Sequence, residues 1–275
     1  MTSPSTSSFT RPSDTHHRRT RTQPRQRVRP LPLSVVERAA LSDTGLRREH
    51  NEDSFMVAER MFAVADGVGG GRAGEVASSV AVEALRIGAH RAFEADDLER
   101  LAQRAAGAVH AKGLADPEFA GMATTLTSAL VAGDRVEVAH AGDSRLYRLR
   151  GGTLECLTDD HSFVSQMLRE GLLTEEQAAV HPMRSMITRA LGRDPDVDFA
   201  KRSIEAAAGD IFLLCSDGLT GMLPDGQIET IVSDSSSLDD AALRLIRQAN
   251  AAGGKDNITV VLFRLGAGAP AALAA

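Results

Sequence analysis

Phe62-Ala63-Val64-Ala65-Asp66-Gly67-Val68-Gly69-Gly70 is the stretch from which the fold of this 275-residue chain is best predicted. Four apolar residues indicate a buried strand, which ends in a carboxylate and is followed by a glycine turn. Glycine lets the backbone beside Asp66 come close to a bound group. Alone, the pattern is ambiguous, because an Asp-Gly pair is also a common turn.

The same arrangement recurs three times along the chain. Ile211–Gly218 is an apolar strand ending in Asp217-Gly218, Val136–Asp143 is a strand ending near an Asp, and Asp256 precedes the apolar run Ile258–Phe263. Like charges converge only around a compensating positive charge. Oxygen ligands favour hard cations such as Mg²⁺ or Mn²⁺, and two such ions about 4 Å apart can activate a water and clamp an in-line displacement at phosphorus. The alternative is that each Asp is an incidental turn residue.

A further acidic cluster, Glu49–Ser54, follows Arg48. Carboxylates here could order metal-bound water, and the planar fork of an arginine could grip a phosphate. The alternative is a charged surface loop.

Composition limits the class of protein. Hydrophobic residues make up 43% of the chain and aromatic residues only 4%, which predicts an aliphatic, Ala-rich core and argues against base stacking on nucleic acid. Cys156 and Cys215 lie in apolar segments and are interpreted as small buried residues in a reducing compartment, hence a cytoplasmic protein. No run approaches the roughly 18 apolar residues of a membrane span, and the N-terminus lacks an apolar signal region.

Charge is unevenly distributed. Residues 1–40 carry eight Arg against two acidic residues, a balance of +6, so the other residues together carry −12. Residues 1–34 are rich in Ser, Thr, Pro and Arg, and are predicted to be a disordered basic tail. This tail could contact nucleic acid, acidic lipid or an acidic partner, or could simply be solvated.

Hydrophobic periodicity predicts blocks of strands and helices, which favour an α+β fold with antiparallel sheets. Residues 35–265 are expected to form one domain, and residues 266–275 a flexible tail. The predicted strands lie within 55–65 and at 124–132, 135–140, 145–150, 211–216 and 257–264. The predicted helices lie at 73–93, 97–111, 162–170 and 238–252, with a short one capped by Thr174.

These segments resemble the metal-dependent serine/threonine protein phosphatases of the protein phosphatase 2C (PP2C, PPM) family, bacterial branch. The resemblance covers nearly all of residues 42–265. Any one motif is weak, but eight in register are specific. The matching segments are SDTGLRREHNEDSF at 42–55, FAVADGVGGGRAGE at 62–75, GMATTL at 121–126, VAHAGDSRLYRLRGG at 138–152, LTDDHS at 157–162, HPMRSMITRALG at 181–192, GDIFLLCSDGL at 209–219 and GGKDNITVV at 253–261.

The resemblance implies a four-layer αββα sandwich of two antiparallel sheets flanked by helix pairs, with a flap near residues 163–190. It implies a site for two Mn²⁺ or Mg²⁺ ions, and a third, weaker ion in bacterial relatives. The matching catalytic and metal-binding residues are Asp66 as the bridging ligand, Gly67 through its carbonyl, Asp217 and Asp256 on the other ion, Asp143 for the third ion, Glu52 and Asp53 for ordering water, and Arg48 for the substrate phosphate.

Two departures concern the leaving-group proton. Some family members carry a histidine directly after Asp-Gly, and many bacterial relatives carry one after Gly-Gly, whereas this chain has Val68 and Gly71. No side chain of this loop can therefore protonate the leaving oxygen, and metal-bound water is the expected substitute. His140 is interpreted as a core histidine, and His161 as a residue that caps or braces a helix entry.

The resemblance implies hydrolysis of phosphoserine and phosphothreonine by direct attack of a metal-bridging hydroxide. The implied partners are phosphorylated proteins and a bacterial Ser/Thr kinase, and the chain is expected to be monomeric. Two alternatives remain. One is a phosphatase of an anti-sigma-factor antagonist, and the other is a non-catalytic phosphoprotein-binding module, which would be expected to lack metal ligands.

Overall fold

The computed structural model describes residues 33–68, 72–90 and 95–268. The strands are β1 (Leu33–Asp43), β2 (Asp53–Val57), β3 (Met61–Val68), β4 (Ala123–Thr124), β5 (Leu126–Ala132), β6 (Arg135–Ala141), β7 (Arg145–Arg150), β8 (Thr153–Cys156), β9 (Ala200–Glu205), β10 (Ile211–Cys215) and β11 (Ile258–Ala267). The helices are α1 (Arg72–Ala89), α2 (Ala95–Ala115), the short 3-10 helix Pro117–Phe119, α3 (Phe163–Arg169), α4 (Glu175–Ala179), α5 (Asp217–Thr220), α6 (Asp225–Asp234) and α7 (Leu238–Ala251).

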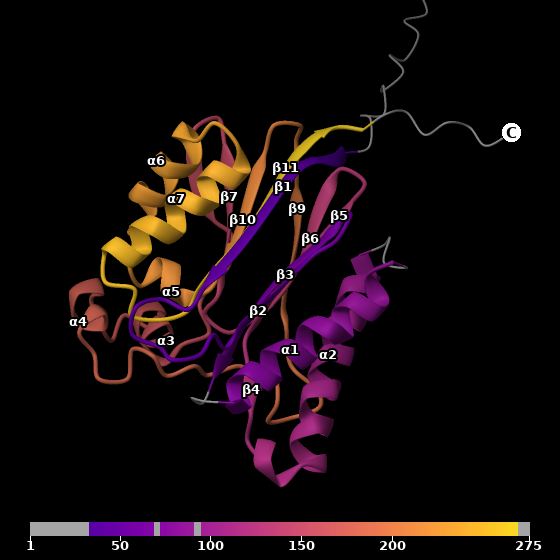
Figure 1. The fold of residues 1–275 in the computed structure, drawn as a ribbon, viewed down its shortest axis with the longest axis vertical. Coiled ribbons are helices and arrows are strands. Elements are labelled where there is room, and N and C mark those ends of the chain that lie inside the picture. Colours follow the sequence, from indigo (N-terminus) through magenta and orange to yellow (C-terminus); the bar gives the residue numbers. More distant parts are fainter. Residues whose placement is uncertain (1–32, 69–71, 91–94, 269–275) are drawn as a thin grey trace, which may run out of the picture. The chain divides into compact units, whose positions relative to one another are not determined.

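The strands form two antiparallel sheets (Figure 1). One sheet has the order β1-β11-β10-β7-β8, and the other has the order β2-β3-β5-β6-β9, with β4 paired to β3. Helices α6 and α7 pack on the first sheet, and α1 and α2 pack on the second. The arrangement confirms the α+β fold with antiparallel sheets that the sequence pattern predicts, and the αββα sandwich that the family resemblance implies.

Apolar side chains of both sheets meet in the middle of the sandwich. Three stacked rings lie at the centre: Phe263 lies 4.1 Å from Phe62 of the other sheet and 5.0 Å from Phe212 of its own, measured between ring centroids. All three side chains are fully buried. Because the chain has nine Phe and no Trp, this stack holds a large share of its aromatic area between the sheets.

Small residues let the outer helices lie close to their sheets. The α1–α2 side of the core is lined by fully buried alanines, among them Ala77, Ala81 and Ala102. Helix α7 buries Leu238, Ala241, Ala242, Leu245, Ile246 and Ala249, a spacing of three and four residues that places them on one face. The Ser237 side chain caps this helix by accepting from the Asp240 N–H at 3.1 Å.

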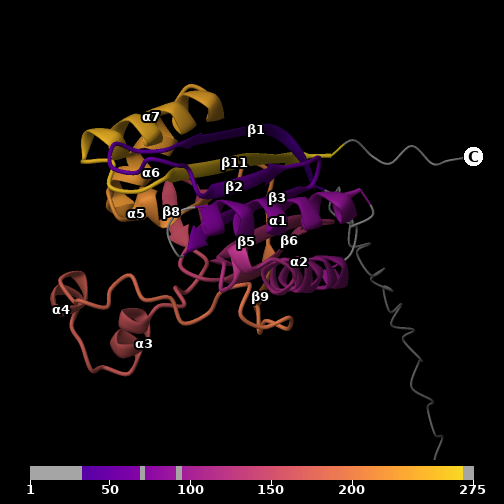
Figure 2. The ribbon, with the colours of Figure 1, turned by 60° about the horizontal axis from the view of Figure 1, so that its bottom comes forward.

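The segment between β8 and β9 holds the short helices α3 and α4, which lie apart from the helix layers in Figure 2. Ser162 caps α3, and Thr174 and Gln177 form a capping box on α4. Two isolated bridges, Ser162–Ile187 and Thr124–Leu191, close the segment at its base. It corresponds to the flap predicted near residues 163–190.

Some expectations from the sequence need correction. Cys215 is buried, but Cys156 is exposed, because it lies on the edge strand β8 with its partner strand on one side only. Strands β1, β8 and β9 and helix α6 were not predicted. β1 begins at Leu33 and β11 ends at Ala267, two residues beyond the expected domain limits at each end. The expected disorder of the basic tail and of the C-terminal tail concerns mainly residues 1–32 and 269–275, which lie outside the described residues.

In the described part of the chain, no helix is both long and apolar enough to cross a membrane.

Candidate active site

Strand register brings the predicted aspartates to one end of the sandwich. β2 and β3 pair Asp53 directly with Asp66. β10 and β7 pair Cys215 with Arg145, and continuing this antiparallel register by two residues brings Asp217 opposite Asp143. Asp256 lies two residues before β11, the neighbour of β10. Five carboxylates from both sheets therefore meet at the same strand ends.

Burial and mutual repulsion raise the pKa values of four of these carboxyl groups, those of Asp53, Asp66, Asp143 and Asp217. Burial raises the pKa of Asp143 to about 8, and the charges of Asp217 and Asp160 contribute. Burial raises the pKa of Asp53 to about 7 and that of Asp217 to about 6, with further contributions from neighbouring aspartates. Burial and the charges of Asp53 and Asp217 raise the pKa of Asp66 well above its usual range. The cluster stores unfavourable negative charge that a cation would relieve.

The backbone of Asp66 is held firmly by two threonines. Its N–H donates to Thr125 Oγ1, while its carbonyl accepts from the Thr125 N–H and from Thr124 Oγ1, each at 2.9 Å. The next residue, Gly67, packs so closely that a Cβ would overlap the carbonyl of Gly74 at the start of α1. The Glu52 side chain is buried against Gly74. The strand end is therefore fixed against α1.

Asn257 joins the loop before β2 to the start of β11. Its Oδ1 accepts from the Glu52 N–H at 2.8 Å, and its Nδ2 donates to the carbonyls of Thr44 and His50 at 3.0 and 2.9 Å. Gly218 packs against the backbone of Asn257, since a Cβ at position 218 would overlap the Asn257 carbonyl. Asn257 stands within the matched GGKDNITVV segment, but nothing in the sequence alone gave it this role.

Arg48 lies at the rim of the cluster. Its Nη2 contacts Asp256 Oδ2 at 2.7 Å, and its side chain is 44% exposed. A guanidinium in this position can reach both the carboxylates and a phosphate arriving from solvent.

The donor set fits divalent cations. Asp53 Oδ1 and Asp143 Oδ1 are buried and have no hydrogen-bond partner among the described residues, although Asp53 Oδ2 accepts from Ser216 Oγ at 2.7 Å. Orphaned carboxylate oxygens in a buried cluster are the ligands that Mg²⁺ and Mn²⁺ require. Within the described ranges, no three acidic, His or Cys side chains already surround one common point, so binding would require small side-chain rotations.

Two histidines, His140 and His161, lie beside the aspartate cluster. As expected, His140 is a buried and satisfied residue, with Nδ1 2.9 Å from Thr127 Oγ1 and Nε2 3.2 Å from the Asp159 carbonyl. His161 stacks on it at 4.7 Å. The cap of α3 is Ser162, while His161 braces the helix entry: its N–H donates to the Gly142 carbonyl and its carbonyl accepts from Thr188.

Replacing His140 by Gln is expected to reduce the loss of stability in acid. Burial lowers the pKa of His140 from 6.5 to about 4, so the folded state binds its proton more weakly than the unfolded state. Its contribution is complete above about pH 6.5 and is lost as the pH falls toward 4, at about 1.4 kcal/mol per unit. Urea unfolding measures the free energy of unfolding at about pH 7 and at about pH 4.5. Between these two pH values, it should fall by about 2 kcal/mol less in the variant than in the wild type. Equal falls would contradict this.

We compared the chain with known protein families and solved structures. A sequence profile described as protein phosphatase 2C matches residues 47–262. The chain belongs to the protein phosphatase 2C family. Its fold is shared by the crystal structure of the Mycobacterium tuberculosis serine/threonine phosphatase PstP/Ppp, with a TM-score of 0.79 and 41% identity over 86% of this chain and 100% of that one.

The chain is also similar to the PstP catalytic domain solved in complex with two manganese ions, with a TM-score of 0.79 and 38% identity over 85% of this chain and 99% of that one. The serine/threonine phosphatase stp of Listeria welshimeri is 38% identical over 80% of this chain and 92% of its own length. Full-length PstP of Mycobacterium tuberculosis is 43% identical over 83% of this chain, but the match spans only 45% of PstP.

Proposed function

We propose that this member of the protein phosphatase 2C family is a metal-dependent phosphatase of phosphoserine and phosphothreonine in proteins. The observation that supports this most is the buried cluster of Asp53, Asp66, Asp143 and Asp217 with two orphaned carboxylate oxygens. Such a cluster is unfavourable by itself and suited to divalent cations. A non-catalytic phosphoprotein-binding module would not need it.

Asp66, Asp217 and Asp256 would hold two Mn²⁺ or Mg²⁺ ions with the carbonyl of Gly67, and Asp143 would contribute to a third. Bound cations would neutralise phosphoryl charge and lower the pKa of water. Asp53, held by Ser216, and Glu52 would orient water beside the substrate. Val68 offers no proton to the leaving oxygen, so a water held at the cation site would supply it.

Arg48 would hold the substrate phosphate. Its exposed guanidinium contacts only one carboxylate oxygen of Asp256, whereas a phosphate would offer two oxygens to the planar fork and more negative charge. If Asp256 held a cation, the Arg48 guanidinium would be free for the substrate phosphate.

Arg48→Gln is therefore expected to lower kcat/KM for a phosphothreonine peptide about 10- to 100-fold, the value of a charged hydrogen bond. Most of the loss should appear in KM. Arg48→Lys should fall in between, because it keeps the charge and loses the fork. The neighbouring exposed Arg47→Gln is the control and should change kcat/KM less than about twofold. If Arg48→Gln keeps the KM of the wild type, Arg48 does not hold the substrate phosphate.

The test of the function is phosphate release from phosphothreonine, phosphoserine and phosphotyrosine peptides, with Mn²⁺ and with EDTA. We expect release from the first two with Mn²⁺ only. Activity on generic peptides would favour a general phosphatase over one dedicated to an anti-sigma-factor antagonist. If the folded protein binds the peptides in Mn²⁺ but releases no phosphate, the binding module is the better description.

The wider role is also proposed. The chain would work as a monomer in the cytoplasm, opposing a Ser/Thr kinase, with the catalytic domain extending from β1 at Leu33 to the end of β11 at Ala267 and a tail on either side. Deleting residues 1–32, which stops before β1, tests the tail, since unchanged localisation and unchanged salt-dependent binding would exclude a tether to nucleic acid or membrane.

A further inference from the structure

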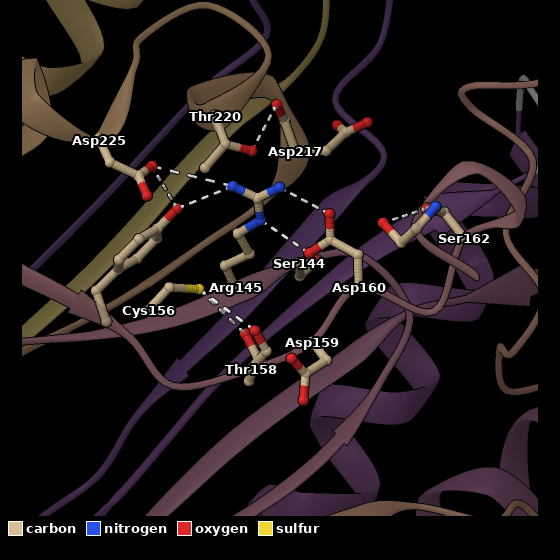
Figure 3. A network of polar contacts seen from close by, with 12 residues as sticks. Ser144, Arg145, Cys156, Thr158, Asp159, Asp160, Ser162, Asp217, Thr220 and Asp225 are labelled. Carbon is tan, nitrogen blue, oxygen red and sulfur yellow. Dashed lines mark hydrogen bonds and ion pairs between the residues drawn. The ribbon is translucent and has the colours of Figure 1, made fainter. Parts of the chain in front are cut away.

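Arg145 is the centre of a polar network beside the carboxylate cluster (Figure 3). Its Nε and Nη2 donate to the two carboxylate oxygens of Asp160 at 2.8 and 2.7 Å, a bidentate pair. Its Nη1 donates to Tyr147 Oη at 3.1 Å and lies 4.0 Å from Asp225 Oδ1, to which Tyr147 donates at 3.0 Å. One guanidinium thus joins β7, the start of α6 and the loop before α3.

The network lies against the cluster. Arg145 follows Asp143 by two residues and pairs across the strands with Cys215, two residues before Asp217. Figure 3 shows Asp217 and Thr220, the first and last residues of α5, in the same neighbourhood.

Asp160 also belongs to the entry of the flap. Its carbonyl accepts from Arg169 Nη1 of α3 at 3.3 Å, and the next residue, His161, donates its N–H to the Gly142 carbonyl at 2.7 Å. Gly142 immediately precedes Asp143 and has a left-handed φ of 120°. The loop that leads into the flap is therefore tied to the chain on both sides of Asp143.

We propose that Arg145 and Asp160 are positioning residues: their bidentate pair holds Asp143 opposite Asp217 for cation binding and fixes the flap entry to the same point. The idea rests on the proposed function. When the pair is intact, Arg145 is occupied and Asp143 faces the cluster. When the pair is broken, the guanidinium can reach the orphaned oxygen of Asp143 and compete with a cation, and the loop can move.

The chain provides a matched control. At the other end of β7, Arg150 makes the same bidentate pair with Asp210 at 2.7 and 2.6 Å, and Asp210 is almost fully buried. Breaking this pair should cost stability without touching the carboxylate cluster. Asp160→Asn and Arg145→Lys are therefore compared with Asp210→Asn and Arg150→Lys.

Calorimetric titration of each purified full chain with MnCl₂ is the test, with thermal unfolding as a check on folding. We expect Asp160→Asn and Arg145→Lys to weaken binding at the weakest Mn²⁺ site about 10-fold, the usual effect of losing a residue that orients a ligand. In phosphopeptide hydrolysis at fixed Mn²⁺, kcat should fall more than KM. Asp210→Asn and Arg150→Lys should lower the melting temperature and leave the Mn²⁺ isotherm unchanged.

Wild-type Mn²⁺ isotherms in both test variants would overturn the proposal, as would equal weakening in Asp160→Asn and Asp210→Asn, or a wild type that binds no Mn²⁺. A wild type that binds Mn²⁺ but releases no phosphate would sink the proposed function alone, since the isotherms still decide the role of the pair.

Discussion

Asp217→Asn is expected to abolish Mn²⁺-dependent hydrolysis of a phosphothreonine peptide, with a loss on the order of 10³-fold or more in kcat/KM. Asn keeps the size of the side chain and can still hydrogen-bond Asp66, so the local packing is retained. It removes the anionic oxygen that would hold a cation.

The stability of Asp217→Asn should not fall with its activity. The carboxyl group of Asp217 is buried among other aspartates, so the amide relieves repulsion, and the melting temperature in EDTA should be unchanged or higher. Asp234→Asn, an exposed acid of α6, is the matched control and should keep full activity. If Asp217→Asn keeps the full Mn²⁺-dependent turnover of the wild type, Asp217 is not a residue of the catalytic site.

Phe263→Ala is expected to cost about 3–5 kcal/mol of unfolding free energy. Phe263 is the middle ring of the stack between Phe62 and Phe212, and all three are fully buried. Rigid strands on both sides prevent the cavity from closing. Folded domains are stable by about 5–15 kcal/mol, so much of the stability would be lost, with a fall in melting temperature of roughly 6–20 °C.

Urea unfolding of Phe263→Ala measures this directly, with Phe163→Ala as the control. Phe163 is half-buried in α3 and touches His181 of the flap, outside the core between the sheets. Its loss should cost about 1 kcal/mol. Similar losses in both variants would show that the stack is not the centre of the core.

The sequence predicted the strands that carry the aspartates because they are buried on both faces. Phe62–Ala65 and Ile211–Cys215 are continuous apolar runs broken by Asp-Gly, a signal that needs no long-range information. The convergence of their ends followed from the resemblance, and the register of β2 with β3 and of β7 with β10 gives its physical basis.

Other parts could not be predicted for physical reasons. β9 is an edge strand with exposed Lys201 and Arg202, so it has no apolar run, and its identity depends on pairing with β6. Arg145 with Asp160 and Asn257 with Glu52 are contacts between distant segments, and single polar residues give no periodic signal. The burial of Cys156 was predicted wrongly. Apolar neighbours in the sequence do not indicate which side of an edge strand is covered.

We infer that the aspartate cluster at the strand ends binds divalent cations. Calorimetric titration of the wild-type chain with MnCl₂ tests it most directly. We predict saturable binding of at least two Mn²⁺ ions per chain, lost in part in Asp217→Asn. A folded wild-type chain that binds no Mn²⁺ at millimolar concentration would contradict the account.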